Sequence, residues 1–389
     1  MKALPAIVWL ELSGIAVDTS KLENFRATAQ GRRETARIKL LEMLGVEDIN
    51  LRSTQQLKKE LNNIGIPVEN TKKEELAKYN HPVLFQLQEY KDTEKLLNTF
   101  IDKMSGFINP KTGRVHADYF QIGAVTGRLA CRNPNMQQQP SKKFHDWKEI
   151  FIAENGNKIV TADYSQIELR ILAQLSGDDE YIRAYKEGTD LHRLTASKVF
   201  NKPLDKVTGD ERSVAKTVNF GIAYGMWVPS LQAKLKPYGI EVDEDEARNI
   251  IDGFYNAYPK VTKYLNTISS LGMRHLSVRT LAGRLIKFER PECKKDQSGV
   301  KRQCKNFPIQ GLCADMVKIA IGNIFLKLEP LGVKFIATVH DEIVFECTKE
   351  QADFVKTTVM DEMSKAASRF ITDLPCYAEA FTNDYWHKD

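Results

Sequence analysis

Two apolar, strand-like runs each lead into a carboxylate, and this pairing constrains the fold more than any other feature. Residues Lys158–Ala162 lead directly into Asp163, and Lys334–Val339 lead into His340 and Asp341. The two aspartates are far apart in the sequence, so only the fold can bring them together. A single aspartate at a strand end is more often a cap or turn residue. Two of them on rigid strands suit a pair of divalent metal ions.

The segment between the two runs carries a basic and aromatic stripe in steps of four residues: Arg212, Lys216, Phe220 and Tyr224. Residues at this spacing share one face of a helix. The cations suit a triphosphate and the rings suit a base or sugar, although an ordinary amphipathic helix gives the same pattern. Gly221 and Gly225 favour the nucleotide interpretation, because glycines within a helix are costly and a base approaching the backbone would explain them. The chain has no phosphate-binding glycine loop ending in Gly-Lys-Ser/Thr, so side chains and metal would hold the triphosphate.

Composition allows a nucleic-acid partner without requiring one, because the formal net charge is +5 over 389 residues. The six cysteines include no Cys-x2-Cys pair, which argues against structural zinc and indicates reduced thiols in a cytosol-like compartment. No stretch approaches the ~20 apolar residues needed to cross a bilayer, so we expect no membrane partner. Residues 1–10 are better interpreted as a buried first element than as a signal peptide.

Periodicity and turn signals predict a helical region at 20–105 and a less regular one at 110–160. Further helices are expected after Ser53, from Ser165 onward, and from Asp243 to Tyr258. Two hairpins are predicted, and their paired strands are Leu276–Thr280 with Leu285–Phe288, and Lys334–Val339 with Ile343–Glu346.

These motifs resemble those of the family A DNA polymerases, the bacterial DNA polymerase I type. The matching segments, in order, are Thr126–Leu129, Asp163–Arg170, Gly188–His192, Arg212–Gly225, Asn306–Gly311 and Val339–Glu342. The resemblance extends from about Leu12 to the C-terminus. It departs from the family pattern at Trp227, where the family usually has Ser, and at Thr338, where Gln is common.

The resemblance implies an α+β, right-hand polymerase fold with an antiparallel palm sheet, helical fingers and a helical thumb. The implied parts are an N-terminal palm-associated segment (1–11), a thumb (12–105), a first palm part (106–175), fingers (176–290) and a second palm part (291–389). No room remains for an exonuclease domain, so the chain is expected not to proofread.

By the same resemblance, Asp163 and Asp341 would bind two Mg²⁺ ions, with Mn²⁺ as a possible substitute. The backbone carbonyl of Tyr164 would assist and Glu342 would support the metal site. Lys216 would protonate the leaving pyrophosphate.

The remaining implied residues bind nucleotide or DNA. The nucleotide-binding set is Arg212, Lys216, Phe220, Tyr224, His192, Glu168 and Gln166. Within it, Glu168 would exclude the ribose 2′-hydroxyl, Phe220 would pack on the sugar and Tyr224 would stack near the templating base. The DNA-binding set is Arg128, Arg302, Asn306, Gln310, His340 and Arg284.

The predicted function is template-directed DNA synthesis on primer-template DNA with deoxynucleoside triphosphates. Three alternatives are a single-subunit RNA polymerase, which Glu168 argues against, a two-metal phosphodiesterase, which has no use for the triphosphate stripe, and a non-catalytic DNA-binding module. We expect a monomer in the cytoplasm, at the nucleoid, with a phage or organelle origin left open.

Overall fold

The chain divides by its internal contacts into two units in the computed structural model, which describes residues 3–140 and 144–387. The larger unit comprises Met1–Gly14, Asp118–Arg132 and Asn155–Asp389. The smaller unit comprises Ile15–Ala117 and Asn133–Glu154. Every candidate site residue lies in the larger unit, so the site is described within one unit.

A four-stranded antiparallel sheet forms the centre of the larger unit, in the order β11-β6-β10-β9. The strands are β6 (Asn157–Tyr164), β9 (Lys334–Val339), β10 (Glu342–Thr348) and β11 (Ala378–Asn383). This confirms the predicted hairpin of β9 and β10. The register pairs Ala162 with Ile343, which puts the end of β6 beside the start of β10.

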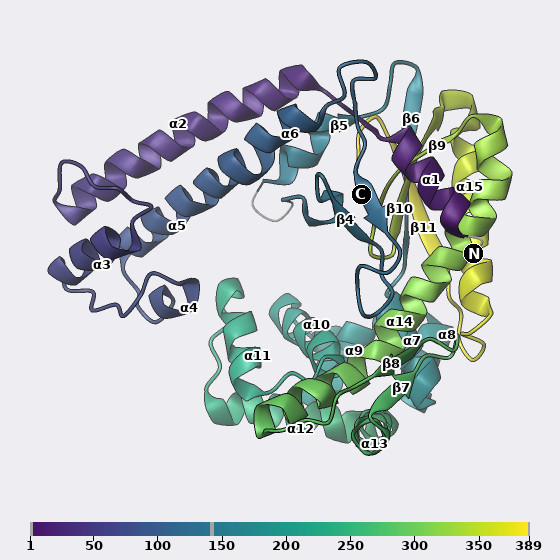
Figure 1. The fold of residues 1–389 in the computed structure, drawn as a ribbon. Coiled ribbons are helices and arrows are strands. Elements are labelled where there is room, and N and C mark those ends of the chain that lie inside the picture. The colour runs from purple at the N-terminus through teal and green to yellow at the C-terminus, as the bar shows by residue number, and fades with distance from the viewer. Residues whose placement is uncertain (1–2, 141–143, 388–389) are drawn as a thin grey trace. The chain divides into compact units, whose positions relative to one another are not determined.

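Helices pack on this sheet and bury its apolar residues (Figure 1). The helix α1 (Ala3–Ser13) packs on β9, where the Trp9 indole contacts Phe335 and Phe345 at ring distances of 5.6 Å each. The same indole donates a hydrogen bond to the Val333 carbonyl, 3.1 Å away. The predicted buried first element is therefore a helix. Two further helices, α14 (Lys294–Leu328) and α15 (Ala352–Ser368), pack together, and α15 also contacts β6 and β11.

The remaining helices of the larger unit lie between β6 and α14 in the sequence. They are α7 (Ile167–Ser176), α8 (Asp179–Glu187), α9 (Leu191–Val199), α10 (Gly209–Ala223), α11 (Val228–Leu235), α12 (Glu244–Ala257) and α13 (Pro259–His275). The predicted start of α12 is confirmed, because Asp243 and Glu246 form a reciprocal capping box. Two small hairpins complete the unit, β3 (Asp118–Phe120) with β4 (Ala130–Arg132), and β7 (Ser277–Arg279) with β8 (Leu285–Lys287). The second is the other predicted hairpin.

The smaller unit is mainly helical, as predicted. Its helices are α2 (Thr19–Leu44), α3 (Thr54–Asn63), α4 (Lys73–Leu76), α5 (Pro82–Lys95), a π-helical segment (Leu96–Ile101) and α6 (Asp102–Phe107). The long helices α2 and α5 lie side by side (Figure 1). A three-stranded sheet joins β1 (Ile15–Val17), β2 (Arg114–Val115) and β5 (Phe151–Ile152). Ser53 caps α3 as expected, accepting from the Gln56 N–H.

The helix at Lys294–Leu331 is long and apolar enough to cross a membrane by length and composition, which corrects the expectation that no stretch approaches that length. Its apolar window is 61% buried inside the structure, as in the core helix of a globular domain. The apolar residues of α14 therefore have protein neighbours. All six cysteines are free thiols, in line with the absence of a disulfide scaffold.

Candidate active site

Sites for small molecules and cofactors are clefts or cavities of roughly 300–1,000 Å³. A cavity of about 480 Å³ lies where the end of β6 meets α7, α9, α10 and the β9–β10 turn. Eleven of its lining residues are members of the predicted site. They are Arg128, Asp163, Tyr164, Gln166, Glu168, His192, Arg212, Lys216, Phe220, His340 and Asp341. Ile167 is the only further lining residue. The fold therefore gathers residues from segments that are far apart in the sequence.

The two aspartates occupy neighbouring strand ends. Asp163 is within β6, opposite Glu379 of β11. Asp341 is in the two-residue turn between β9 and β10, where His340 has the left-handed φ of 59°. The Thr338 hydroxyl donates to the Glu342 carbonyl across this turn at 3.0 Å. Thr338, one of the two departures from the pattern of the resembling family, thus stabilises the turn that carries Asp341.

The donor atoms at this edge of the sheet fit magnesium. Two carboxylates and the Tyr164 backbone supply hard oxygen ligands, and Mg²⁺ is commonly held by one or two carboxylates together with substrate phosphates. No cluster of three or more His, Cys, Asp or Glu residues suited to a metal occurs within 3–140 and 144–387.

Glu342 lies next to this edge but does not line the cavity. Its side chain is buried and accepts a hydrogen bond from the buried Trp386 indole, with 2.5 Å between Nε1 and Oε1. Its predicted role is support of the metal site, and that role stays a prediction. This hydrogen bond joins the start of β10 to the C-terminal segment, and Glu342 would support the metal site through it.

The two cations of the stripe differ in how they are held. The Arg212 guanidinium donates from Nε to Asp190 Oδ2 at 2.7 Å, and Asp190 also caps α9 by accepting from the His192 and Arg193 N–H groups. Lys216 is exposed, and no ion pair joins it to another residue of the described segments. Arg212 is thus fixed in direction, while the Lys216 side chain on the same face of α10 is exposed.

His192 is buried and neutral at physiological pH. Its pKa is lowered to about 4, mainly by burial; the Asp190 charge opposes this shift, and the Arg212 and Lys216 charges add to it. The Tyr181 hydroxyl donates to Asn219 Oδ1 at 3.0 Å, which leaves the Asn219 amide N–H facing His192 Nδ1 at 2.9 Å. With Nδ1 accepting, the imidazole proton is assigned to Nε2.

This burial predicts a pH-dependent loss of stability. The unfolded chain binds a proton at this histidine below its ordinary pKa of 6.5, whereas the folded chain does not until about pH 4, so acidification favours unfolding. From pH 7.5 to pH 4.5, the free energy of unfolding of the His192→Gln variant is expected to fall by about 2–3 kcal/mol less than that of the wild-type protein. Urea unfolding of both proteins at the two pH values measures it. An equal fall in the free energy of unfolding in both proteins would contradict the prediction.

Glu168 lies between two partners within the site. Arg128 donates to its Oε1 at 2.5 Å, and the Tyr224 hydroxyl donates to its other oxygen. Burial raises the pKa of Glu168, and the Arg128 charge opposes that shift. Tyr224 is the residue that ends α10 and does not line the cavity. It reaches the site through its hydroxyl group alone.

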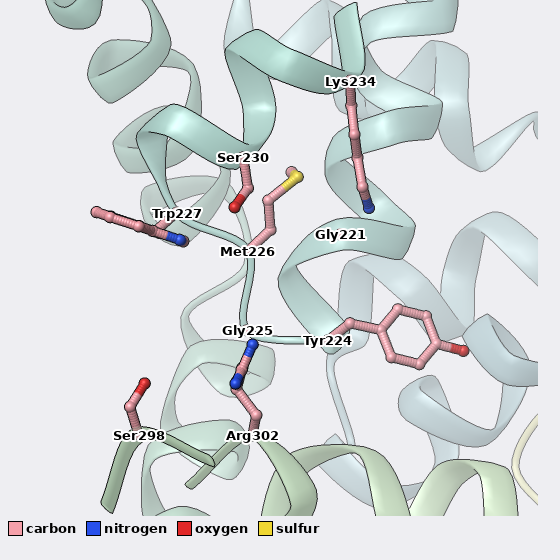
Figure 2. Close-up of a pocket in the computed structure, with 9 residues that line it drawn as sticks. All are labelled: Gly221, Tyr224, Gly225, Met226, Trp227, Ser230, Lys234, Ser298 and Arg302. Carbon is pink, nitrogen blue, oxygen red and sulfur yellow. The ribbon is translucent and has the colours of Figure 1, made fainter. Parts of the chain in front are cut away.

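The structure gives the two glycines of the stripe a packing role and a turn role, and the approach of a base to them stays a prediction. Gly225 is beyond the end of α10 with a left-handed φ of 69°, so it is not inside the helix as expected. A Cβ at Gly221 would lie 2.3 Å from the Met226 methyl group. Gly221 therefore leaves room for the Met226 side chain where the chain turns back under α10, and Gly225 adopts the left-handed conformation of the turn (Figure 2).

Phe220 and Gln166 are held beside the same cavity. The Phe220 ring centre lies 5.7 Å from that of His192. Gln166 begins α7 in a left-handed conformation, with φ 52°, and its Oε1 accepts from the Tyr185 hydroxyl at 3.2 Å. A non-glycine residue in this conformation is uncommon and often marks a functional position.

Three of the predicted DNA-binding residues, Arg302, Asn306 and Gln310, are spaced by four along α14 and so share one helix face. Asn306 Oδ1 and Arg128 Nε are buried and have no hydrogen-bond partner within the described residues. Such buried polar atoms are rare without a ligand or water to satisfy them. His340 lines the same cavity as Asp163 and Asp341, and burial is the main cause that lowers its pKa.

Arg284 occupies a supporting position. Its guanidinium pairs with Asp315 at 2.5 Å, and a Cβ at Gly127 would lie 2.5 Å from its Cζ. The Gly127 backbone, with φ 78°, thus packs directly on the guanidinium. Arg284 holds the segment that presents Arg128.

Sequence reasoning missed the residues that orient the site: Asp190, Asn219 and Asp315. Asp190 had a detectable signal, because Asp before an apolar helical run is a preferred N-cap. For Asn219 and Asp315 no local signal exists, since both act on residues from other elements.

Known proteins resemble this chain over nearly its whole length. The family model of DNA polymerase family A matches residues 19–388 of this chain. The thermostable DNA polymerase I of Thermus aquaticus is 34% identical over 372 residues, which cover 91% of this chain and 44% of that protein. DNA polymerase I of Pseudomonas aeruginosa is 32% identical over 405 residues, covering 99% of this chain and 43% of that protein.

One solved structure aligns with a TM-score of 0.90 at 27% identity, covering 99% of this chain and 69% of the other. It is the POL domain of Pol1 from M. smegmatis in complex with DNA primer-template and dNTP. The predicted α+β polymerase fold is thereby confirmed. The chain spans less than half the length of the two bacterial polymerases described above.

Proposed function

The chain belongs to DNA polymerase family A, and from that premise we propose that it performs template-directed DNA synthesis, adding deoxynucleotides to a primer 3′-hydroxyl and releasing pyrophosphate. The observation that carries the proposal is the cavity that Asp163, Asp341, Arg212, Lys216 and Glu168 line together. Phosphoryl transfer depends mainly on positioning and charge stabilisation, which such a set supplies.

Family A DNA polymerases are metal-dependent, and we propose two Mg²⁺ ions for this chain. The Asp163 and Asp341 carboxylates and the Tyr164 carbonyl would hold them. When bound, two such ions stabilise the charge on the attacking and leaving oxygens of an in-line displacement. The rigid strand ends keep both carboxylates in place before substrate arrives.

The chain's own cations and rings would orient the nucleotide. Arg212, fixed by Asp190, offers a guanidinium to a phosphate oxygen, and the Nε2–H of neutral His192 donates to another. The ammonium group of Lys216 would neutralise the developing pyrophosphate and give it a proton. Phe220 would pack on the sugar.

Sugar selection is assigned to Glu168. Arg128 and the Tyr224 hydroxyl hold its carboxylate from two sides, so it has little freedom to move away from a ribose 2′-hydroxyl. A group that cannot move aside excludes the bulkier sugar by steric repulsion.

For its partners we propose primer-template DNA and deoxynucleoside triphosphates, the ligands named for the M. smegmatis domain. Asn306, Gln310 and Arg128 would donate to minor-groove acceptors, which look alike for every correct base pair. Arg302 and His340 would contact the template and the primer end. We further propose that the chain acts as a monomer in the cytoplasm.

Extension of a labelled primer on a DNA template with Mg²⁺ tests the proposal. We expect extension with deoxynucleotides and almost none with ribonucleotides. A 3′-mismatched primer in the same assay checks the expectation that this chain does not trim DNA. Strand cleavage without extension would favour the phosphodiesterase, and efficient ribonucleotide extension would favour the RNA polymerase.

The role of Glu168 predicts a change in sugar preference. We expect Glu168→Ala to lower the preference for deoxynucleotides over ribonucleotides by roughly 100-fold or more, because the space for a 2′-hydroxyl opens. The ratio of kcat/KM values for the two substrates measures it. Glu168→Gln is the matched control, because it keeps the bulk and should keep most of the preference. Unchanged selectivity in the alanine variant would contradict the role.

A further inference from the structure

The helix α7 carries a buried arginine that the proposed chemistry does not use. Arg170 is 3% exposed, and it does not line the cavity that holds Asp163 and Asp341. No ion pair joins its guanidinium to a carboxylate within the described part of the chain. A buried charge without a counter-charge is costly unless other groups compensate it, so the surroundings of this side chain need an explanation.

Two backbone carbonyls and two aromatic rings surround the Arg170 guanidinium. Its Nε donates to the Ser165 carbonyl at 2.7 Å, and a terminal nitrogen donates to the Pro375 carbonyl at 2.5 Å. The guanidinium carbon lies 4.3 Å from the ring centre of Tyr185 and 4.8 Å from that of Tyr377. Rings at such distances attract a cation. A lysine could not make all four contacts, because it lacks the planar fork of arginine.

These contacts close a loop of hydrogen bonds around the turn that follows β6. The Ser165 carbonyl accepts from Arg170, and the Ser165 N–H donates to the Tyr377 carbonyl at 3.3 Å. Pro375 and Tyr377 belong to the segment that leads into β11, which pairs with β6 as far as Tyr164. Arg170 therefore joins the start of α7 to the segment that precedes β11.

The N–H of Ser165 determines the direction of the Tyr164 carbonyl. The two groups belong to one trans peptide unit, in which the C=O and the N–H point to opposite sides. Because the N–H is directed at Tyr377 beside β11, the carbonyl is directed to the other side of β6. The strand order β11-β6-β10 puts β10 and the Asp341 turn on that side.

We propose that Arg170 is a positioning residue of the metal site. By holding the turn after β6 against the segment before β11, it keeps the Tyr164 carbonyl directed toward Asp341. The inference rests on the proposed function, which gives this carbonyl a metal ion to bind. Contacts that orient metal ligands from outside affect metal affinity or activity by roughly 10–100-fold when they are lost.

Binding of Mn²⁺ to the chain measures this role without any reaction, because the paramagnetic resonance signal of free Mn²⁺ falls as the ion binds. We expect Arg170→Lys to weaken this binding by roughly tenfold, since lysine keeps the charge but cannot bridge both carbonyls. Asp163→Asn defines the Mn²⁺ that binds elsewhere. Arg114→Lys is the matched control and should bind as the wild-type chain does, because Arg114 is an equally buried arginine, 4% exposed, of the smaller unit.

Tyr377 provides a milder pair of variants if Arg170→Lys does not fold. Its side chain is 46% exposed, so replacing it disturbs little of the core. Tyr377→Ala removes one ring from the guanidinium and should weaken Mn²⁺ binding by roughly threefold. Tyr377→Phe keeps the ring and should bind Mn²⁺ as the wild-type chain does.

Primer extension over a range of Mg²⁺ concentrations is the second measurement. We expect Arg170→Lys to need roughly tenfold more Mg²⁺ for half of its maximal rate, and to recover most of the wild-type rate when Mg²⁺ is saturating. A purely structural role would instead lower the rate by the same factor at every Mg²⁺ concentration, because part of the chain would be unfolded.

The outcomes separate this inference from the proposed function. Wild-type Mn²⁺ affinity in Arg170→Lys and Tyr377→Ala, or a loss of rate that Mg²⁺ does not reverse, would overturn the positioning role even if the wild-type chain extends primers. Weaker Mn²⁺ binding in Arg170→Lys, together with no primer extension by the wild-type chain, would support the positioning role and overturn the proposed function.

Discussion

Replacing Asp163 or Asp341 by Asn is expected to lower the rate of primer extension by roughly 10³-fold or more. Each substitution keeps the shape of the side chain and removes one of the two carboxylates that line the cavity. The remaining donors would hold metal too weakly to stabilise the charge of the reaction. Single-turnover extension of a labelled primer, at saturating deoxynucleotide and Mg²⁺, measures the chemical step directly.

The control for these variants is a carboxylate on the same part of the fold. Asp384 is 76% exposed and pairs with Lys158 at the start of β6, away from the cavity. Because exposed ion pairs contribute little, Asp384→Asn should keep its rate within about twofold. Primer-template affinity should stay within about threefold for all three variants, since most of it comes from phosphate contacts. Extension at near-normal rates by either Asp163→Asn or Asp341→Asn would contradict the two-metal assignment.

The strands and the cavity that Asp163 and Asp341 line were predictable, because both follow from local patterns together with the pairing of antiparallel strands. The apolar runs Lys158–Ala162, Lys334–Val339 and Ile343–Glu346 identify β6 and the β9–β10 hairpin. An antiparallel pairing of two such strands puts the end of β6 beside the start of β10, so Asp163 and Asp341 come together. The four-residue period of α10 similarly puts Arg212, Lys216 and Phe220 on one face toward the same cavity.

The orienting contacts were not predictable, because each joins two elements whose packing the sequence pattern does not encode. Asp190 was readable as a helix cap, but nothing local indicates that its second oxygen faces Arg212 from another helix. Arg284 was expected to bind DNA because the family resemblance implies it. Its pair with Asp315 and its contact with Gly127 depend on the β7–β8 hairpin lying against α14.

Gly221 and Gly225 were both predicted to lie inside a helix, and only Gly221 does. The prediction that these glycines are unusual was sound, but periodicity alone extended the helix too far. The chain leaves α10 after Ala223 and folds back so that Met226 packs on Gly221. The predicted thumb, palm and fingers boundaries stay predictions, because the contacts separate two units and do not divide the larger one.

Lys216→Ala is expected to lower kcat by roughly 10²–10⁴-fold, the range for loss of a positioned general acid. The side chain also carries a positive charge beside the triphosphate, so KM for the nucleotide should rise as well. Rapid-quench measurements over a range of deoxynucleotide concentrations separate the two effects. Lys206→Ala is the matched control, because Lys206 is an exposed lysine, 73%, outside the cavity.

Lys216→Arg distinguishes proton donation from charge. Arginine keeps the positive charge but does not deprotonate in proteins, so it should restore KM while kcat stays well below the wild-type value. Recovery of both constants would mean that Lys216 acts through charge alone. A wild-type kcat in Lys216→Ala would remove it from the mechanism. Arg212 could not replace it in that case without movement, because Asp190 fixes the direction of its guanidinium, and the leaving pyrophosphate would have to receive its proton from water.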